Sequence, residues 1–232
     1  MKYDRMKLNH SIKGKYRARN LVNWIFTKPS KILLSFVAIL DLPVKLVNLL
    51  NLFLAILSAI LIVSFPDYIW FAGIILYLSF CMDIVGTAWA RYNNKEDIYI
   101  KWFDETNGLL RVFIIFLAGA WVTFKSTENP YVLLLFGIAV FSYLMMNYAG
   151  ALISLIAHQY KIKDNLSDVI KKSLSKSTSW ISHSPLGFSF EYQWIIIVLC
   201  TLFNKFVLLF WIFIIFSNLK WMQGYFMLRA KK

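Results

Sequence analysis

The sequence predicts an all-α integral membrane protein with six transmembrane helices and both termini in the cytosol. The 232-residue chain is 59% hydrophobic and 18% aromatic, with a mean hydropathy of +0.59, values far outside the range of soluble domains. It contains several apolar runs of about 20 residues, the length that crosses a hydrocarbon core of about 30 Å. Most Lys and Arg residues fall between alternate runs, which is typical of cytosolic loops.

The first four membrane helices are joined by turn-forming or polar segments. A turn at 65–67, which contains Pro66, separates the first two, and a loop at 125–130 separates the third from the fourth. A polar segment at 91–103 connects the two pairs. We expect these helices at about 44–64, 69–90, 104–124 and 131–157.

The last two helices are harder to separate, because the run from Trp194 to Phe203 has only ten residues before Asn204. We predict a tight hairpin at Asn204-Lys205, with the fifth helix beginning nearer Phe188. A single long helix over 192–219 is the alternative that the pattern leaves open.

The charge distribution predicts the orientation. The chain has 25 Lys and Arg against 12 Asp and Glu, a net charge of +13, and nine of the basic residues lie before residue 32. With six spans, the short loops on one side carry only Lys125 and Lys205, so the other side is expected to be cytosolic. This alternation favours a membrane-facing basic surface over nucleic-acid binding. No cleavable signal sequence is expected, and the predicted location is the cytoplasmic membrane.

Two parts are expected, a basic cytosolic segment at 1–42 and a membrane domain at 43–232 with a cytosolic loop at about 158–190. Apolar residues recur at helical spacing between lysines at 161–177, which predicts an amphipathic helix on an anionic leaflet, and 20–40 is interpreted similarly. Either segment could equally be a docking face for a partner. Cys81 and Cys200 are interpreted as small apolar residues.

The features that indicate chemistry are acids near the ends of two adjacent apolar segments. Asp83 lies in the inner third of the second predicted helix, where a charge is costly and calls for a functional reason. Asp104 begins the third predicted helix at the same end of the bundle. Residues expected on the same helical faces as these acids are Thr87, Ala90 and Arg91, and Asn107, Gly108 and Arg111. We expect the two carboxylates to meet in one cytosol-facing cavity.

At these residues the chain resembles the CDP-alcohol phosphotransferase family. The family signature reads Asp, two spacers, Asp-Gly, two spacers, Ala-Arg, eight spacers, Gly, three spacers, Asp, three spacers, Asp. The matching positions are Asp83, Ala90, Arg91 and Asp104, and the other four are occupied by Gly86, Thr87, Ile100 and Gly108. The family also has six transmembrane helices, and the stretch from Val47 through Asn48 to Asn51 is similar to the start of its first helix.

The resemblance implies transfer of a substituted phosphate from a CDP-linked alcohol to an acceptor alcohol, with release of CMP. At least one of the two alcohols is expected to be a lipid. Asp83 and Asp104 would be metal ligands for Mg²⁺ or Mn²⁺, one ion rather than two because two signature acids are replaced. Substrate contacts are expected from Asn48, Gly86, Thr87, Ala90, Arg91, Asn107 and Arg111.

The final signature acid is replaced by Gly108, which cannot act as a base. Glu105 is the nearest substitute, although on a regular helix it points about 100° away from Asp104. Asn107 could orient an acceptor without deprotonating it. An altered mechanism, another nucleotide donor and loss of catalysis all remain open, since a positioned base is worth about 10²- to 10⁴-fold.

Some of these candidate residues also have purely structural interpretations. Asp104 could be a helix N-cap, and Asn48 and Asn51 could form hydrogen bonds between helices without touching substrate. At the level of the whole protein, the alternatives are a non-catalytic relative that binds nucleotide or lipid or scaffolds a complex, and a transporter. A homodimer is also open.

Overall fold

The computed structural model describes residues 11, 21–95, 98–159 and 188–229, and helices joined by short turns make up nearly all of them. Four helices are long and apolar enough to cross a membrane, and the helices at Phe190–Leu202 and Phe206–Met222 are apolar but shorter. No strand occurs in these residues. The all-α class and the apolar character of the bundle are thus as predicted, while the number of spans and their orientation stay predictions.

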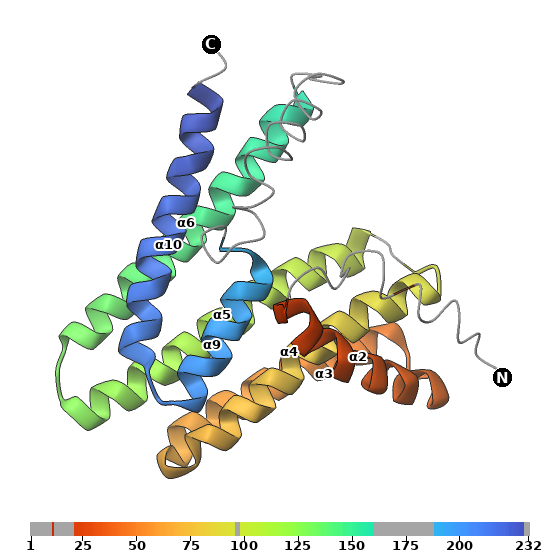
Figure 1. Ribbon diagram of the computed structural model, residues 1–232, viewed down its shortest axis with the longest axis horizontal. Coiled ribbons are helices and arrows are strands. Elements are labelled where there is room, and N and C mark those ends of the chain that lie inside the picture. The colour runs from red at the N-terminus through yellow and green to blue at the C-terminus, as the bar shows by residue number, and fades with distance from the viewer. Residues whose placement is uncertain (1–10, 12–20, 96–97, 160–187, 230–232) are drawn as a thin grey trace.

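The elements follow one another as helical hairpins. In chain order they are α2 (Leu21–Ile39), α3 (Val44–Ser64), the 3-10 turn η1 (Pro66–Tyr68), α4 (Ile69–Tyr92), α5 (Ile98–Thr127), α6 (Tyr131–Gln159), α9 (Phe190–Leu202) and α10 (Phe206–Arg229). The short turns after α3, α5 and α9 lie together at the lower end of the bundle in Figure 1, and α6 and α10 run side by side.

Local backbone preferences explain where these turns fall. Pro66 lies at the start of η1, where a missing N–H costs no helical hydrogen bond. Asn204 has a φ of 52°, a left-handed conformation that asparagine adopts more readily than most residues. This turn separates α9 from α10, so the predicted hairpin at Asn204-Lys205 is confirmed and the single long helix is excluded.

One predicted boundary is wrong. Helix α5 begins at Ile98, six residues before Asp104, so Asp104 lies inside the helix and is not its N-cap. The earlier start has a packing reason, because the Ile100 side chain is buried in an apolar cluster that includes Val44 and Val47 of α3. Burial of one face extends the helix through a segment that looked like a polar connection in the sequence.

Helices α3 and α4 pack closely through small and polar residues, which is how helices associate in lipid. Ser58 Oγ donates to the Ala72 carbonyl oxygen at 2.9 Å, and Ser79 Oγ donates to the Asn51 carbonyl oxygen at 2.6 Å. These bonds fix the register of the hairpin that carries Asp83.

The predicted amphipathic segment at 20–40 forms a helix, α2, one face of which packs on α4. The Phe26 and Phe80 ring centroids are 4.4 Å apart, and Ser30 Oγ donates to the Cys81 carbonyl oxygen at 3.2 Å. The opposite face exposes apolar side chains, among them Ile32 and Phe36. The second predicted amphipathic helix, at 161–177, lies outside the described residues.

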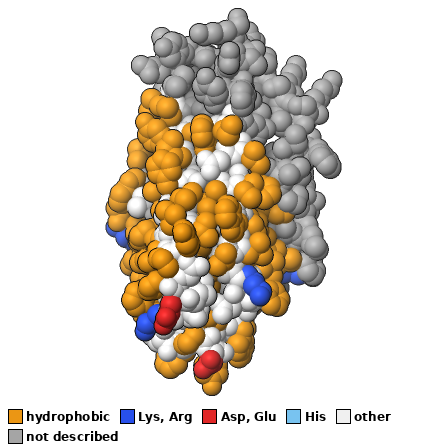
Figure 2. Space-filling model, turned by 90° about the vertical axis from the view of Figure 1, so that its left-hand side faces the viewer, with side chains coloured by type: hydrophobic (Ala, Val, Ile, Leu, Met, Phe, Trp, Pro, Cys, Tyr) orange, Lys and Arg blue, Asp and Glu red, His pale blue; other side chains and the backbone are white. Residues whose placement is uncertain are grey.

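The outer surface of the bundle is largely apolar. Figure 2 shows hydrophobic side chains across the middle of one face, with charged side chains of the described residues near its lower end. Large exposed apolar residues occur on every long helix, for example Phe53, Trp70, Leu117, Phe141 and Trp211. Such a surface is expected for a protein whose solvent is the bilayer.

Candidate functional site

A cavity of about 930 Å³ contains both of the acids singled out by the sequence, Asp83 of α4 and Asp104 of α5. It lies at the end of the bundle opposite the short turns, between α4, α5, α6, α9 and α10. The polar residues in its lining include Asp83, Asp104, Glu105, Glu191, Gln193 and Lys220. The two acids therefore line one cavity, while its opening to the cytosol stays a prediction.

Asp83 is buried, with 5% of its surface exposed, and its carboxylate is paired with Arg111. Arg111 Nη2 lies 2.8 Å from Asp83 Oδ1, and the Arg111 side chain is fully buried. The Arg111 guanidinium carbon also lies 4.7 Å from the centroid of the Trp194 ring, within cation–π distance. A buried carboxylate is thus neutralised by a cation that is itself shielded from solvent.

Three asparagines connect this ion pair to the neighbouring helices. Asn51 Nδ2 donates to Asp83 Oδ1 at 2.9 Å, and Asn107 Nδ2 donates to Asn51 Oδ1. Asn107 Nδ2 also lies 3.4 Å from the Asn48 carbonyl oxygen. Asn48, Asn51 and Asn107 are all buried, and none is part of the cavity lining. Their positions favour the interpretation that they join α3, α4 and α5 by interhelical hydrogen bonds.

The Asp104 side chain lies beside α4, one helical turn after Asp83. Thr87 Oγ1 donates to the Asp83 carbonyl oxygen at 3.2 Å and lies 3.5 Å from Asp104 Oδ2. Glu105, the residue after Asp104, points in a different direction on a regular helix, yet it also lines the cavity. Two adjacent acids of α5 therefore face one space.

Arg91 and Ala90, which match the signature, lie away from the cavity lining. Arg91 Nη1 donates to the Ser11 carbonyl oxygen at 3.3 Å, and Ala90 is buried in an apolar cluster with residues of α2 and α3. In this structure Arg91 connects α4 to the N-terminal part of the chain, and the arginine beside Asp83 is Arg111.

Two glycines replace signature acids, and the structure gives them different surroundings. A Cβ atom at Gly86 would lie 2.1 Å from Asn48 Oδ1, so any side chain there would have to displace the buried Asn48 amide. A Cβ atom at Gly108 would lie 3.8 Å from the Phe190 ring, an ordinary contact distance. A side chain at 86 therefore disturbs its neighbour, whereas the position at 108 has room for one.

We expect Gly86→Ala to lower the unfolding temperature and Gly108→Ala to leave it unchanged or raise it. Overpacking a buried contact costs about 1–3 kcal/mol, whereas replacing an unhindered helical glycine gains about 0.5–1 kcal/mol. Both glycines lie in buried stretches of helix, so each variant is the matched control of the other. Thermal unfolding in the same detergent measures the difference, and an equal shift in both variants would contradict the packing explanation.

Several lining residues were missed from the sequence. Lys220 Nζ donates to the Phe188 carbonyl oxygen at 2.9 Å, and Glu191 Oε2 accepts from Ser189 Oγ at 2.7 Å. A lysine within an apolar helix was a usable signal, because ionisable residues at membrane depth mark sites. Trp194, which lies outside the lining but contacts Arg111, offered no such signal, since that contact depends on where α9 packs in the bundle.

The carboxylates of the cavity are the side chains that bear on the predicted metal site. No group of three or more His, Cys, Asp or Glu side chains in the described parts of the chain is placed to hold a metal. Mg²⁺ commonly uses one or two carboxylates, with waters and substrate phosphates completing its octahedron. Asp83 and Asp104 both line the cavity, and their binding of a single ion stays a prediction.

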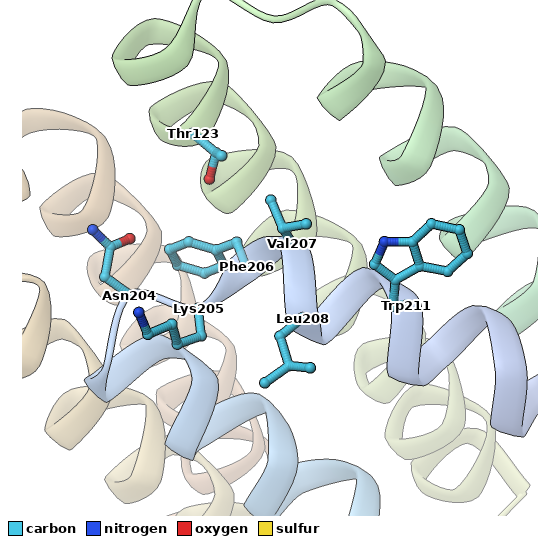
Figure 3. A pocket seen from close by; sticks show the side chains of 7 residues that line it. All are labelled: Thr123, Asn204, Lys205, Phe206, Val207, Leu208 and Trp211. Atoms are coloured by element: carbon cyan, nitrogen blue, oxygen red, sulfur yellow. The ribbon is translucent and has the colours of Figure 1, made fainter.

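A smaller cavity, of about 450 Å³, lies at the opposite end of the bundle beside the hairpin of α9 and α10. Figure 3 shows its lining, which includes Thr123, Asn204, Lys205 and Trp211. No carboxylate lines it, so among the described residues the chemistry indicated by the acids belongs to the larger cavity.

No protein-family model and no curated protein matches this sequence. The resemblance to the CDP-alcohol phosphotransferase family therefore depends on the signature positions and the helix pattern, and membership in that family stays a prediction.

Proposed function

We propose that the protein is a membrane phosphotransferase that moves a substituted phosphate from a CDP-linked alcohol to an acceptor alcohol and releases CMP. The observation that carries the proposal is that Asp83 and Asp104, from adjacent helices, line one cavity. The distribution of Lys and Arg supports a cavity that opens to the cytosol from the cytoplasmic membrane.

The shape of the cavity supports a lipid on one side of the reaction. Its α6 wall includes Leu144 and Tyr148, which expose 49% and 63% of their surfaces. Such apolar and aromatic lining is suited to an alcohol with an acyl chain. The phosphates would be bound by the acids of α4 and α5 through the metal ion.

In the reaction, a bond forms between the acceptor oxygen and the phosphorus that carries the substituent. The bond from that phosphorus to the oxygen bridging the two phosphates breaks, and CMP leaves with the bridging oxygen. Glu105 is the residue that would take the proton of the acceptor hydroxyl, since it lines the cavity beside Asp104. Asp83 and Asp104 would hold a Mg²⁺ or Mn²⁺ ion, which would neutralise charge on the departing CMP.

A second candidate is a non-catalytic protein that binds a cytidine nucleotide or a lipid headgroup. The specific observation in its favour is the Arg111–Asp83 pair, which already satisfies one oxygen of a signature acid. Thermal stabilisation by CMP or CDP, in the absence of turnover, would support this candidate over the first.

The proposal is tested by measuring CMP release from purified protein in mixed micelles. Several CDP-linked alcohols are paired with glycerol-, inositol- and lipid-type acceptors, each with Mg²⁺, with Mn²⁺ and with EDTA. We expect release that requires both the donor and the divalent ion. Absence of CMP across all pairs, from protein with a cooperative unfolding transition, would overturn the catalytic proposal.

A further inference from the structure

We infer that Lys220 of α10 is an anion-binding residue of the larger cavity and takes a phosphate oxygen of the ligand bound there. Which molecule carries this phosphate rests on the proposed function. The anion site itself does not, because it follows from the surroundings of the Lys220 side chain.

Lys220 is the only Lys or Arg among the described residues that line the cavity. Arg111, which is paired with Asp83, is not part of the lining. The other charged side chains of the described lining are four acids, namely Asp83, Asp104, Glu105 and Glu191. Within the described part of the wall, an anion that enters the cavity therefore meets one positive charge, that of Lys220.

The Lys220 ammonium has hydrogen-bonding capacity left for a ligand. Its Nζ donates to the Phe188 carbonyl oxygen at 2.9 Å, which uses one of the three N–H groups of an ammonium. No carboxylate of the described residues lies within ion-pair distance of Nζ. A half-buried ammonium in an apolar helix is costly without an anionic partner, and a phosphate oxygen would supply one.

Glu191 is the acid whose charge acts on Lys220. It lies in the first turn of α9, where its Oε2 accepts a hydrogen bond from Ser189 Oγ at 2.7 Å. Glu191 thus attracts the ammonium without contacting it, and the remaining N–H groups of Lys220 stay available to a ligand. Phosphate is the anion that best fits them, since lysine is a common phosphate ligand in proteins.

The start of α9 fixes the position of the ammonium. Phe188 has a φ of 41°, and its buried ring packs on α10, with centroids 5.0 Å from the Phe213 ring and 5.6 Å from the Phe216 ring. The Phe188 carbonyl oxygen also accepts from Gln193 Nε2 at 2.9 Å. Because Lys220 shares a face of α10 with Phe216, this carbonyl holds Nζ at the cavity wall. A cation held in this way loses less entropy on binding a ligand than a freely rotating lysine.

Binding of three phosphate-bearing probes tests this inference without any turnover. The purified protein is titrated by calorimetry with CMP, with inorganic phosphate and with micelles that contain phosphatidic acid. We expect at least one probe to bind about tenfold or more weakly to Lys220→Met, because a charge-assisted hydrogen bond is lost. Loss for CMP alone assigns a nucleotide phosphate, loss for phosphatidic acid alone assigns a lipid headgroup, and loss for several probes assigns a general oxyanion site.

Two further variants of Lys220 separate its charge from its contact with Phe188. Lys220→Gln removes the charge but keeps a hydrogen-bond donor, and should show the same loss of affinity. Lys220→Arg keeps the charge and should retain most of the affinity. Raising the salt concentration should weaken binding to the parent protein more than to Lys220→Met, an effect that a purely structural role would not produce.

Lys205→Met is the matched control. Lys205 is an exposed lysine at the other end of the bundle, beside the smaller cavity (Figure 3), so its removal should leave the affinity for every probe unchanged. Absence of binding for all three probes, or equal affinity in the parent protein and the folded Lys220 variants, would overturn the inference. CMP release is measured separately, so phosphate binding through Lys220 without turnover would contradict only the proposed reaction.

Discussion

Arg111→Met is expected to lower the unfolding temperature of the purified protein by at least about 6 °C. The substitution leaves Asp83, which is 5% exposed, without its cation, and breaking a buried ion pair from one side costs about 3–5 kcal/mol. For a chain of this length, each kcal/mol corresponds to about 2–4 °C. Thermal unfolding in a fixed detergent, followed by tryptophan fluorescence, measures the shift.

The double variant Asp83→Asn/Arg111→Met separates charge from packing. Replacing both partners by neutral side chains removes the uncompensated charge, so its unfolding temperature should lie much closer to that of the parent protein. If the single and double variants lose equal stability, the loss comes from packing against Trp194 and the buried charge is not responsible. Adding Mn²⁺ should stabilise the single variant more than the double one, since only the single variant retains the carboxylate.

Asp104→Asn is expected to reduce CMP release by at least about 100-fold while leaving the unfolding temperature nearly unchanged. The loss follows because a metal ion contributes several kcal/mol to stabilising transferred charge, and each 1.4 kcal/mol is about tenfold in rate. Stability should change less than in Arg111→Met because Asp104 is only half-buried, whereas Arg111 is fully buried. Initial rates of CMP formation at saturating Mn²⁺ provide the measurement.

Glu128→Gln is the matched control for that loss. Glu128 is an exposed acid at the turn between α5 and α6, at the other end of the bundle, so its neutralisation should leave CMP release unchanged. Glu105→Gln should reduce release by about 10²- to 10⁴-fold if it supplies the base. Full activity of Asp104→Asn, or an equal decrease in Glu128→Gln, would contradict the assigned role of Asp104.

Much of the helical arrangement could be predicted from apolar run lengths and turn residues. The hairpin at Asn204-Lys205 was predicted from two polar residues between apolar runs, and the φ of Asn204 gives the physical reason. The start of α5 was not predictable in this way. The prediction treated 91–103 as one polar connection, although from Ile98 to Phe103 only Lys101 is charged, and in the structure Ile100 is buried.

The candidate site was predictable in outline only. Helical periodicity brought Asp83 and Asp104 to the same end of the bundle, because acids in apolar segments are rare enough to be informative. The sequence did not show which arginine forms the ion pair with Asp83, because Arg91 and Arg111 both share helical faces with signature residues. The structure distinguishes them, because Arg111 contacts both the Asp83 carboxylate and the Trp194 ring.

The short length of α9 has a consequence for access from the aqueous phase. Its 13 residues extend about 20 Å, which is about 10 Å less than the hydrocarbon thickness of a bilayer. In the predicted six-span topology, with the α9–α10 hairpin at one membrane surface, the first turn of α9 and the Glu191 carboxylate would lie below the headgroups of the other surface, a depth at which a charged side chain calls for water beside it.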